Sequence, residues 1–303
     1  MNKILITTGN GMFGGALAEE LLKMNVPLRI MVRDVKKCRI DNRNAEIVTG
    51  DLDKPETLRV AMEGVGSVFL STPMDNRIAE REKNIIDAAI ECGIQQIVKI
   101  YGAVKHDGDQ LVEEHHQAFD HLMKSGIPWT LISPNSVMET SLLNMSASIK
   151  YMHSIYGCSG NGKVGLVALQ DVTRVTAFVL TSPDHAGQNY ELTGPESLDM
   201  SSVAGCFSDV LNRKIAYVDL SEEKMSGMMM KFDKTMTPEK LELEVLCHLR
   251  AWKKGQADMV TDTYHKLMGT DPTSLKTFIH DNKETFSKGM APVFMAWIMR
   301  KMM

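Results

Sequence analysis

Residues 3–24, KILITTGNGMFGGALAEELLKM, are the stretch of sequence that decides the fold. Ile4 to Ile6 form a short apolar run that is typical of a buried strand, and a turn follows it directly. The turn reads Gly-x-Gly-x-x-Gly from Gly9 to Gly14. A helix is predicted next from apolar residues that share one face at spacings of 4, 4 and 3: Phe13, Leu17, Leu21 and Met24.

The glycine turn has the composition that a dinucleotide-binding turn requires. Glycines permit a tight turn and let the backbone approach a diphosphate closely, while the N–H groups and the dipole at the start of a helix favour an anion. The motif alone is weak, because an ordinary glycine turn reads the same. Its place between a strand and a helix, with further alternation after it, favours a dinucleotide site from Gly9 to Gly14.

Up to residue 133 the sequence alternates between short β-branched runs and helical periodicity. Six strands are predicted, at Ile4–Ile6, Leu28–Val32, Glu46–Val48, Ser67–Ser71, Ile97–Ile100 and Trp129–Ile132. Strands joined by helical crossovers form a parallel sheet covered by helices. The sequence therefore predicts an α/β fold with a doubly wound parallel sheet of the Rossmann type.

After residue 134 the alternation weakens, and a second, irregular domain is expected. The chain is predicted to return to the sheet at Val164–Ala168 and again at Asn189–Thr193, which makes the sheet domain discontinuous. The two expected domains are residues 1–134 completed by residues 164–193, which bind NAD(P), and residues 135–163 with 194–303, a smaller and mostly helical lobe that binds the substrate.

Composition and charge exclude several classes of function. The 303 residues carry 34 Lys and Arg against 38 Asp and Glu, a net charge of -4, whereas a broad nucleic-acid surface needs clustered positive charge. The five cysteines form no CxxC pair and the histidines no HxxxH pair, so we expect neither disulfides nor a metal site. No signal peptide and no apolar stretch of about 20 residues for membrane insertion is recognised. We expect a cytoplasmic monomer or homodimer that acts on a small molecule.

Arg33 and Asp34 end the second predicted strand. An acidic residue about twenty residues beyond the glycines usually accepts hydrogen bonds from the ribose hydroxyls of NAD. Arg33 comes first, however, and a guanidinium pairs with the 2′-phosphate of NADP, which a carboxylate repels. We therefore expect NADP, with NADPH preferred over NADH and no flavin. The alternative is a surface arginine with Asp34 turned to the ribose.

Four segments carry a resemblance to a known family. They are the glycine turn, Gly50-Asp51-Leu52, Ile127-Pro128-Trp129-Thr130 and Tyr190-Glu191-Leu192-Thr193-Gly194-Pro195. The chain resembles the NmrA-like branch of the atypical short-chain dehydrogenases over essentially its whole length. It is most similar there to bacterial NAD(P)H-dependent quinone, azo-dye and triphenylmethane-dye reductases. One departure is that Thr8 replaces the first glycine of the family's TGATGxxG turn, and Gly9 follows one place later.

The resemblance implies a set of cofactor contacts. Those to the diphosphate come from Gly9, Gly11, Met12, Phe13 and Gly14, and Arg33 contacts the adenosine phosphate. Asp51 and Leu52 lie against the adenine, and Ser71, Thr72 and Pro73 run beside the cofactor. The residues that border the nicotinamide are Tyr101, Pro134, Asn135 and Ser136. Most of these residues follow the carboxyl ends of predicted strands, where ligands bind in a doubly wound sheet.

The usual acid of short-chain dehydrogenases is missing. Their Tyr-x-x-x-Lys pair corresponds here to Leu111 and His115. His115 lies on the apolar stripe of its predicted helix and is expected to point toward the sheet and the cofactor. Several dye and quinone reductases that the chain resembles carry histidine there, which would bind the ribose or donate a proton. Tyr101 is the alternative donor, and a half-buried core histidine is the plain interpretation.

A missing acid favours activated acceptors. Hydride transfer to a quinone or a cationic dye gives a delocalised product that water can protonate, whereas an unactivated ketone leaves an alkoxide that needs a positioned donor. Met138 and Glu139 are predicted to contact the acceptor, although methionines at helical spacing commonly fill a core. The sequence predicts an NADPH-dependent reductase of a quinone-like, azo or other conjugated acceptor. The alternative is an NADP(H)-sensing regulator without turnover, and an epimerase or dehydratase is disfavoured without the tyrosine.

Overall fold

The computed structural model describes residues 3–40, 45–102 and 109–287. The chain divides into two compact units, and each is assembled from separated segments. Unit 1 comprises residues 1–134, 169–192 and 263–269, and unit 2 comprises residues 135–168, 193–262 and 270–303. The chain therefore enters each unit three times.

Unit 1 is built on a parallel sheet whose seven strands all lie within the described residues. Their order across the sheet is β10 (Gln188–Leu192), β6 (Trp129–Pro134), β5 (Gln96–Ile100), β4 (Val65–Leu70), β1 (Lys3–Ile6), β2 (Leu28–Val32) and β3 (Ala45–Thr49). Every neighbouring pair is parallel. The chain runs outward from β1 in one direction and from β4 in the other, so the sheet is doubly wound. The predicted fold class is confirmed, and the six predicted strands lie within two residues of their expected bounds.

The strand order reverses between β1 and β4. In doubly wound sheets, ligands bind in the crevice outside the carboxyl ends of the strands at such a reversal. Ile6 at the end of β1 pairs with Phe69 near the end of β4, so the two strands finish at the same level. The glycine turn after β1 and the segment Ser71-Thr72-Pro73 after β4 therefore emerge at one edge of the sheet.

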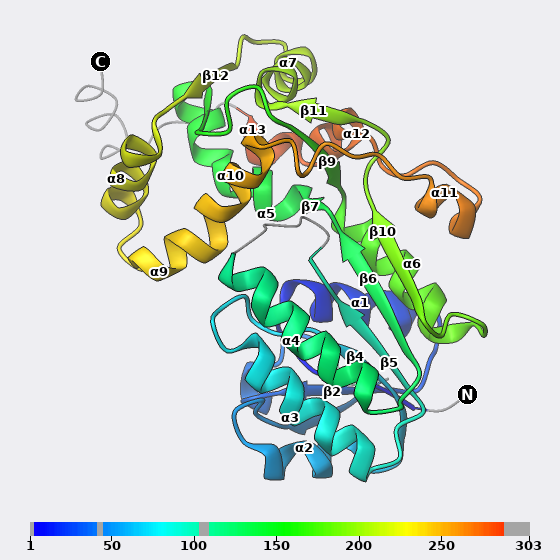
Figure 1. The fold of residues 1–303 in the computed structure, drawn as a ribbon. Coiled ribbons are helices and arrows are strands. Elements are labelled where there is room, and N and C mark those ends of the chain that lie inside the picture. The colour runs from blue at the N-terminus through cyan, green and yellow to red at the C-terminus, as the bar shows by residue number, and fades with distance from the viewer. Residues whose placement is uncertain (1–2, 41–44, 103–108, 288–303) are drawn as a thin grey trace. The chain divides into compact units, whose positions relative to one another are not determined.

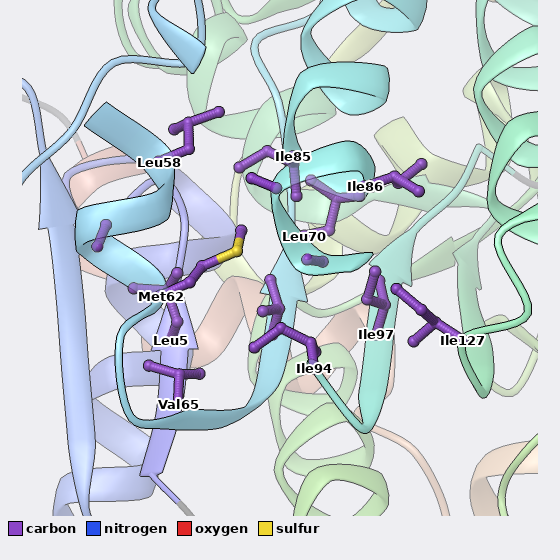
Figure 2. Close-up of a cluster of buried hydrophobic side chains, with 14 of the residues drawn as sticks. Leu5, Leu58, Met62, Val65, Leu70, Ile85, Ile86, Ile94, Ile97 and Ile127 are labelled. Atoms are coloured by element: carbon purple, nitrogen blue, oxygen red, sulfur yellow. The ribbon is translucent and has the colours of Figure 1, made fainter. Parts of the chain in front are cut away.

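Helices cover both faces of this sheet (Figure 1). They are α1 (Met12–Lys23), α2 (Pro55–Met62), α3 (Ile78–Glu91), α4 (Gln110–Lys124), α6 (Leu169–Thr181) and α11 (Thr263–Met268). Figure 1 shows α2, α3 and α4 as a layer on one face, and α1 with α6 on the other. Figure 2 shows the core of the first layer, in which Met62 and Ile85 of the helices gather against Leu5, Leu70 and Ile97 of the strands. This burial of apolar surface holds the strand ends in fixed positions.

Unit 2 combines helices with two small sheets in the described residues. One sheet has the order β11 (Ser197–Asp199), β9 (Lys163–Val167) and β7 (Ser136–Val137), and the other pairs β12 (Ala216–Asp219) with β8 (Ser154–Gly157). The α-helices are α5 (Met138–Leu142), α7 (Met200–Leu211), α8 (Glu222–Phe232), α9 (Pro238–Leu241), α10 (Cys247–Lys253), α12 (Leu275–Asp281) and α13 (Lys283–Phe286). A 3₁₀ turn lies at Leu143–Met145, and π-helical turns lie at Ser148–Met152 and Glu242–Leu246.

The predicted return to the principal sheet at Val164–Ala168 is wrong. These residues belong to β9, which pairs with β7 and β11 in unit 2. The apolar pattern correctly indicates a buried strand, but the choice of partner depends on long-range pairing that local hydrophobicity does not encode. The second predicted return, Asn189–Thr193, corresponds to β10, which is parallel to β6.

The short helix α11 also differs from the predicted domain ranges. The predicted ranges assign it to the second lobe, yet it belongs to unit 1, where it contacts α6 and β10. A helix of this length carries too little periodicity to reveal its partner.

Among the helices of the described residues, none combines the length and the apolar character that a membrane crossing requires.

Candidate functional site

Two glycines of the turn after β1 have no room for a side chain. A Cβ atom at Gly9 would lie 2.1 Å from Cγ2 of Ile30 on β2, and one at Gly14 would lie 2.1 Å from the carbonyl oxygen of Thr8. Both distances are far shorter than an ordinary contact between heavy atoms. The glycines therefore let α1 begin close against the sheet, so that backbone forms much of the turn.

The first turn of α1 presents backbone N–H groups rather than a capping side chain. Gly11 is the N-cap residue, no side chain in the described part of the chain caps it, and the first turn holds no acidic residue. Met12, Phe13 and Gly14 occupy the positions whose N–H groups a helix leaves without an internal acceptor. With the positive end of the helix dipole, these groups fit the diphosphate of a dinucleotide.

Thr8, which stands where the family turn has glycine, joins two strand ends. Its Oγ1 lies 2.5 Å from Oγ of Ser71. Thr7 makes two further bonds to the same residue, since its hydroxyl donates to the carbonyl oxygen of Ser71 at 3.0 Å and accepts from the N–H of Ser71 at 3.2 Å. The departure from the family turn therefore fastens the glycine turn to the segment that contains Ser71, Thr72 and Pro73.

Arg33 and Asp34 follow β2 and have different environments. The carboxylate of Asp34 accepts from the N–H of Lys36 at 3.0 Å and so caps a short helical turn, whereas Arg33 is exposed. Asn10 of the glycine turn donates to the carbonyl oxygen of Lys37 at 3.0 Å, which fixes this basic loop to the turn. The guanidinium of Arg33 is therefore exposed at this edge, whereas the partly exposed carboxylate of Asp34 is engaged by the backbone of its own loop.

Asp51 and Leu52 shape the loop after β3. The carboxylate of Asp51 accepts from the N–H of Asp53 at 3.1 Å, and the N–H of Asp51 donates to Oγ1 of Thr57 at 3.0 Å. Leu52 is part of the buried core, and its carbonyl oxygen accepts from the side chain of Asn84 at 3.0 Å. Because β3 lies beside β2 in parallel register, this well-defined loop emerges at the same edge as Arg33.

Four polar side chains, Thr72, Glu82, Lys99 and His115, form what we call the polar cluster. Lys99 of β5 has a side chain that is 0% exposed and pairs with Glu82 of α3, which is 1% exposed, at a distance of 2.6 Å between Nζ and Oε2. The hydroxyl of Thr72 donates to Oε1 of Glu82 at 3.0 Å. On the other side, Nζ of Lys99 lies 3.4 Å from Nδ1 of His115. A buried ion pair therefore connects a predicted cofactor contact with the predicted acid.

The sequence interpretation missed Glu82 and Lys99, although a signal for both was present. Lys99 interrupts the apolar run Ile97–Ile100, and Glu82 stands on the apolar face of its helix between Ile78 and Ile85. A charged residue at a buried position requires a partner, so two such positions on adjacent elements indicate an ion pair. Desolvation lowers the pKa of the Lys99 ammonium and raises the pKa of the Glu82 carboxyl.

His115 and Tyr101 lie next to each other in unit 1. His115 is half-buried against β5, while the adjacent His116 is exposed. The ring centroids of Tyr101 and His115 are 5.3 Å apart, and the Tyr101 ring centroid lies 5.5 Å from Nζ of Lys99. Burial raises the pKa of the Tyr101 phenol, so this group stays protonated at neutral pH. Both predicted proton donors therefore adjoin the same buried ammonium.

The other predicted residues follow β6, which ends at Pro134. Those in unit 2 are Asn135, Ser136, Met138 and Glu139. The side chain of Asn135 donates to the carbonyl oxygen of Ala257 at 2.9 Å, and its Oδ1 is buried without a hydrogen-bond partner among the described residues. Met138 is 1% exposed, and its methyl group would lie 3.6 Å from a Cβ at Gly194. In this structure Met138 is thus packed within unit 2.

Comparison with known sequences shows the family to which this chain belongs. A profile of the NmrA-like family matches residues 1–275. An NAD(P)H azoreductase from Xenophilus azovorans is 30% identical over 234 residues, which cover 75% of this chain and 82% of the azoreductase. A (4-alkanoyl-5-oxo-2,5-dihydrofuran-3-yl)methyl phosphate reductase from Streptomyces griseus is 24% identical, covering 94% of this chain and 99% of that protein.

Solved structures share the fold. The triphenylmethane reductase of Citrobacter sp. superposes with a TM-score of 0.82 at 23% identity and covers 94% of this chain and 99% of that one. The NADPH-dependent quinone oxidoreductase of Escherichia coli, solved in complex with NADPH, gives a TM-score of 0.81 at 24% identity, covering 92% of this chain and 99% of that one.

Proposed function

Since the chain belongs to the NmrA-like family, we propose that it is an NADPH-dependent reductase of quinone-like, azo or other conjugated acceptors. The family match confirms the predicted family, and the names of the relatives agree with the predicted class of enzyme. The observation that carries the proposal is the glycine turn. It places uncapped N–H groups next to two glycines that leave no space for a Cβ atom, at the reversal of the strand order.

Different residues of this chain would contact different parts of the cofactor. The backbone from Gly9 to Gly14 would hold the diphosphate, and the exposed guanidinium of Arg33 would pair with the 2′-phosphate. Asp51 and Leu52 remain the proposed adenine contacts. Ser71, Thr72 and Pro73 are proposed to run beside the cofactor, and His115 to bind its ribose or donate a proton. The proposed neighbours of the nicotinamide are Tyr101, Pro134, Asn135 and Ser136. Bound NADPH would supply a hydride, which is the chemistry that the protein itself cannot provide.

His115 is proposed as the residue that assists protonation of the reduced acceptor, and Tyr101 is the second candidate. His115 is supported by its half-buried place beside the ammonium of Lys99. Because the raised pKa of Tyr101 makes its phenol a reluctant proton donor, the imidazole is the better choice. Unit 2 is proposed to supply the acceptor-binding surface. Met138 and Glu139, which follow the first residues of this unit, are the proposed acceptor contacts.

The decisive experiment measures NADPH binding by calorimetry and NADPH oxidation with quinones, azo dyes, conjugated enones and imines. We expect binding of NADPH and its oxidation by at least one conjugated acceptor. Tight binding without oxidation by any acceptor would identify an NADP(H)-sensing regulator instead. An absence of binding at millimolar NADPH would contradict both interpretations.

A matched pair of histidine variants tests the proposed acid. His115→Ala is expected to lower kcat by about 100-fold, the usual contribution of a positioned acid, and to leave NADPH affinity within about threefold. His116→Ala removes the exposed neighbour on the same helix and should leave kcat unchanged. Equal rates for the two variants would remove His115 from its proposed role.

A further inference from the structure

Three groups that attract or accept an N–H surround the ammonium of Lys99. An ammonium group carries three N–H donors and no acceptor. In the described part of the chain, Nζ is hydrogen-bonded to the carbonyl oxygen of Ile100 at 3.3 Å and to Nδ1 of His115 at 3.4 Å, and it forms an ion pair with Oε2 of Glu82 at 2.6 Å. His115 therefore accepts a hydrogen bond from one of the three N–H groups of a fully buried cation.

This match decides which ring nitrogen of His115 carries the proton. A neutral imidazole has one N–H and one acceptor nitrogen. Because an ammonium only donates, Nδ1 is the acceptor and the N–H lies at Nε2. Nε2 is on the opposite edge of the ring and lies near Gly102. A Cβ atom at Gly102 would be 3.9 Å from Nε2. An imidazolium would direct an N–H at the ammonium, so the neutral ring is the form that fits.

We infer that Lys99 and Glu82 are positioning residues that hold His115 as its Nε2–H tautomer and resupply its ring with a proton through Nδ1. The inference rests on the proposed function only for the destination of the Nε2 proton, which is the reduced acceptor. Glu82 fixes Lys99, and the hydroxyl of Thr72 fixes Glu82 at 3.0 Å. The ring of Tyr101 flanks the ammonium at 5.5 Å from its centroid.

The proton transfer balances with solvent as the only outside source of protons. The N–H bond at Nε2 breaks as its proton moves to the reduced acceptor, while an N–H bond of Lys99 breaks and a new one forms at Nδ1. The imidazole stays neutral, and Lys99 becomes an amine beside the carboxylate of Glu82. A solvent proton then adds to Nε2 of the half-buried ring, and the proton at Nδ1 returns to Lys99. No atom changes its oxidation state in this relay.

Burial is consistent with such a role. Desolvation lowers the pKa of Lys99, which makes release of its proton to His115 easier than release from an exposed lysine. A buried ion pair is commonly no more stabilising than an apolar pair of the same volume. Stability alone therefore does not account for two charges between β5 and α3, whereas a donor aimed at His115 does.

The first test is the tautomer of His115, read from ring ¹⁵N chemical shifts of the labelled protein without cofactor. In the wild-type protein we expect an unprotonated Nδ1 and a protonated Nε2. In Lys99→Met/Glu82→Gln, which removes both charges together, Nδ1 loses its donor and the two tautomers should become comparably populated. His121, whose Nε2 lies 2.6 Å from Oδ1 of Asp87 on the neighbouring helix, is an internal reference that should not change.

The second test is kinetic. The double variant should lower kcat by about 10- to 100-fold while KM for NADPH changes by less than about twofold, because the pair acts through the acid. Lys99→Arg retains a cation that only donates and should restore the tautomer and part of kcat. Arg29→Met is the matched control: this buried cation bonds to the carbonyl oxygens of Ala61 and Glu63, and its loss should lower stability without changing the tautomer or kcat.

Two results would overturn the inference even in a protein that oxidises NADPH. The first is a protonated Nδ1 in the wild-type protein, or a tautomer that does not change in the double variant. The second is a changed tautomer with wild-type kcat, because the relay would then have no role. An absence of NADPH oxidation by the wild-type protein would instead remove the proposed function and the relay with it, while the spectra would still decide the positioning role.

Discussion

The glycine turn after β1 and the polar cluster around Lys99 belong to the same sheet, yet they are built in opposite ways. The turn depends on missing side chains, because a Cβ at Gly9 or Gly14 would overlap atoms 2.1 Å away. The polar cluster depends on side chains that are present, with a cation and a carboxylate both withdrawn from water. Adding atoms should therefore damage the first region, and removing them should damage the second.

The largest effect is expected from Lys99→Met, which leaves the carboxylate of Glu82 buried without its cation. Removal of one partner of a buried pair typically lowers the free energy of unfolding by about 3–5 kcal/mol. Urea denaturation measures this loss. The double variant Lys99→Met/Glu82→Gln should recover most of it, and equal stability of the single and double variants would show that the charges are not coupled.

A smaller effect is expected from Gly14→Ala, which places a methyl group against the carbonyl oxygen of Thr8. Overpacking of this kind costs about 1–3 kcal/mol in the free energy of unfolding. The displaced turn should also weaken NADPH binding at least about tenfold, or roughly 1.4 kcal/mol. Gly205→Ala is the matched control, because a Cβ there meets nothing within 4 Å and gains up to about 1 kcal/mol of helix propensity.

Arg33→Asp should alter the choice of cofactor rather than stability. The exposed guanidinium is proposed to bind the 2′-phosphate, so the ratio of NADPH to NADH affinity should fall by about tenfold, a modest value because water and salt screen the pair. Lys36→Asp makes the same charge change on the adjacent loop and should shift the ratio less. Calorimetry with both cofactors gives the two ratios, and equal shifts would assign the preference to general charge.

The smallest effect is expected from Asp53, in the loop after β3. A hydrogen bond from Arg81, with 2.7 Å between Nε and Oδ1, holds the pKa of Asp53 below its ordinary value of 3.8. The stabilisation is therefore complete above that value and is lost as the pH falls through the lower pKa of the folded protein. It should amount to less than about 1 kcal/mol because the pair is partly exposed. Urea midpoints of Asp53→Asn and the wild-type protein should converge as the pH falls; a constant difference would contradict this assignment.

The glycine turn could be predicted from sequence because its requirements are local. Gly9, Gly11 and Gly14 lie within six residues, and the strand before them and the helix after them have clear periodicity. The same reasoning located the strands of the sheet, since each is a short apolar run between helices. Local patterns failed for Val164–Ala168, because two candidate sheets were available and only long-range pairing selects between them.

The polar cluster was predicted only in part. Helical spacing identified His115, but its partner Lys99 comes from a strand and Glu82 from another helix. Each of the two charges appears in the sequence as an isolated break in an apolar pattern. Their meaning emerges only when the register of β5 and the packing of α3 bring Nζ and Oε2 to 2.6 Å, which is a tertiary relation.

The threefold entry of the chain into unit 1 has a consequence for biosynthesis. A ribosome that has released only residues 1–134 has produced β6 with one side unpaired, because its partner β10 begins at Gln188. Such an open edge of parallel strand is a template for association with other nascent chains. Helix α11, at Thr263–Met268, arrives later still. The parallel sheet of unit 1 is thus completed only after most of the polypeptide has been synthesised, so nonsense truncations before residue 188 should yield aggregates rather than a smaller functional protein.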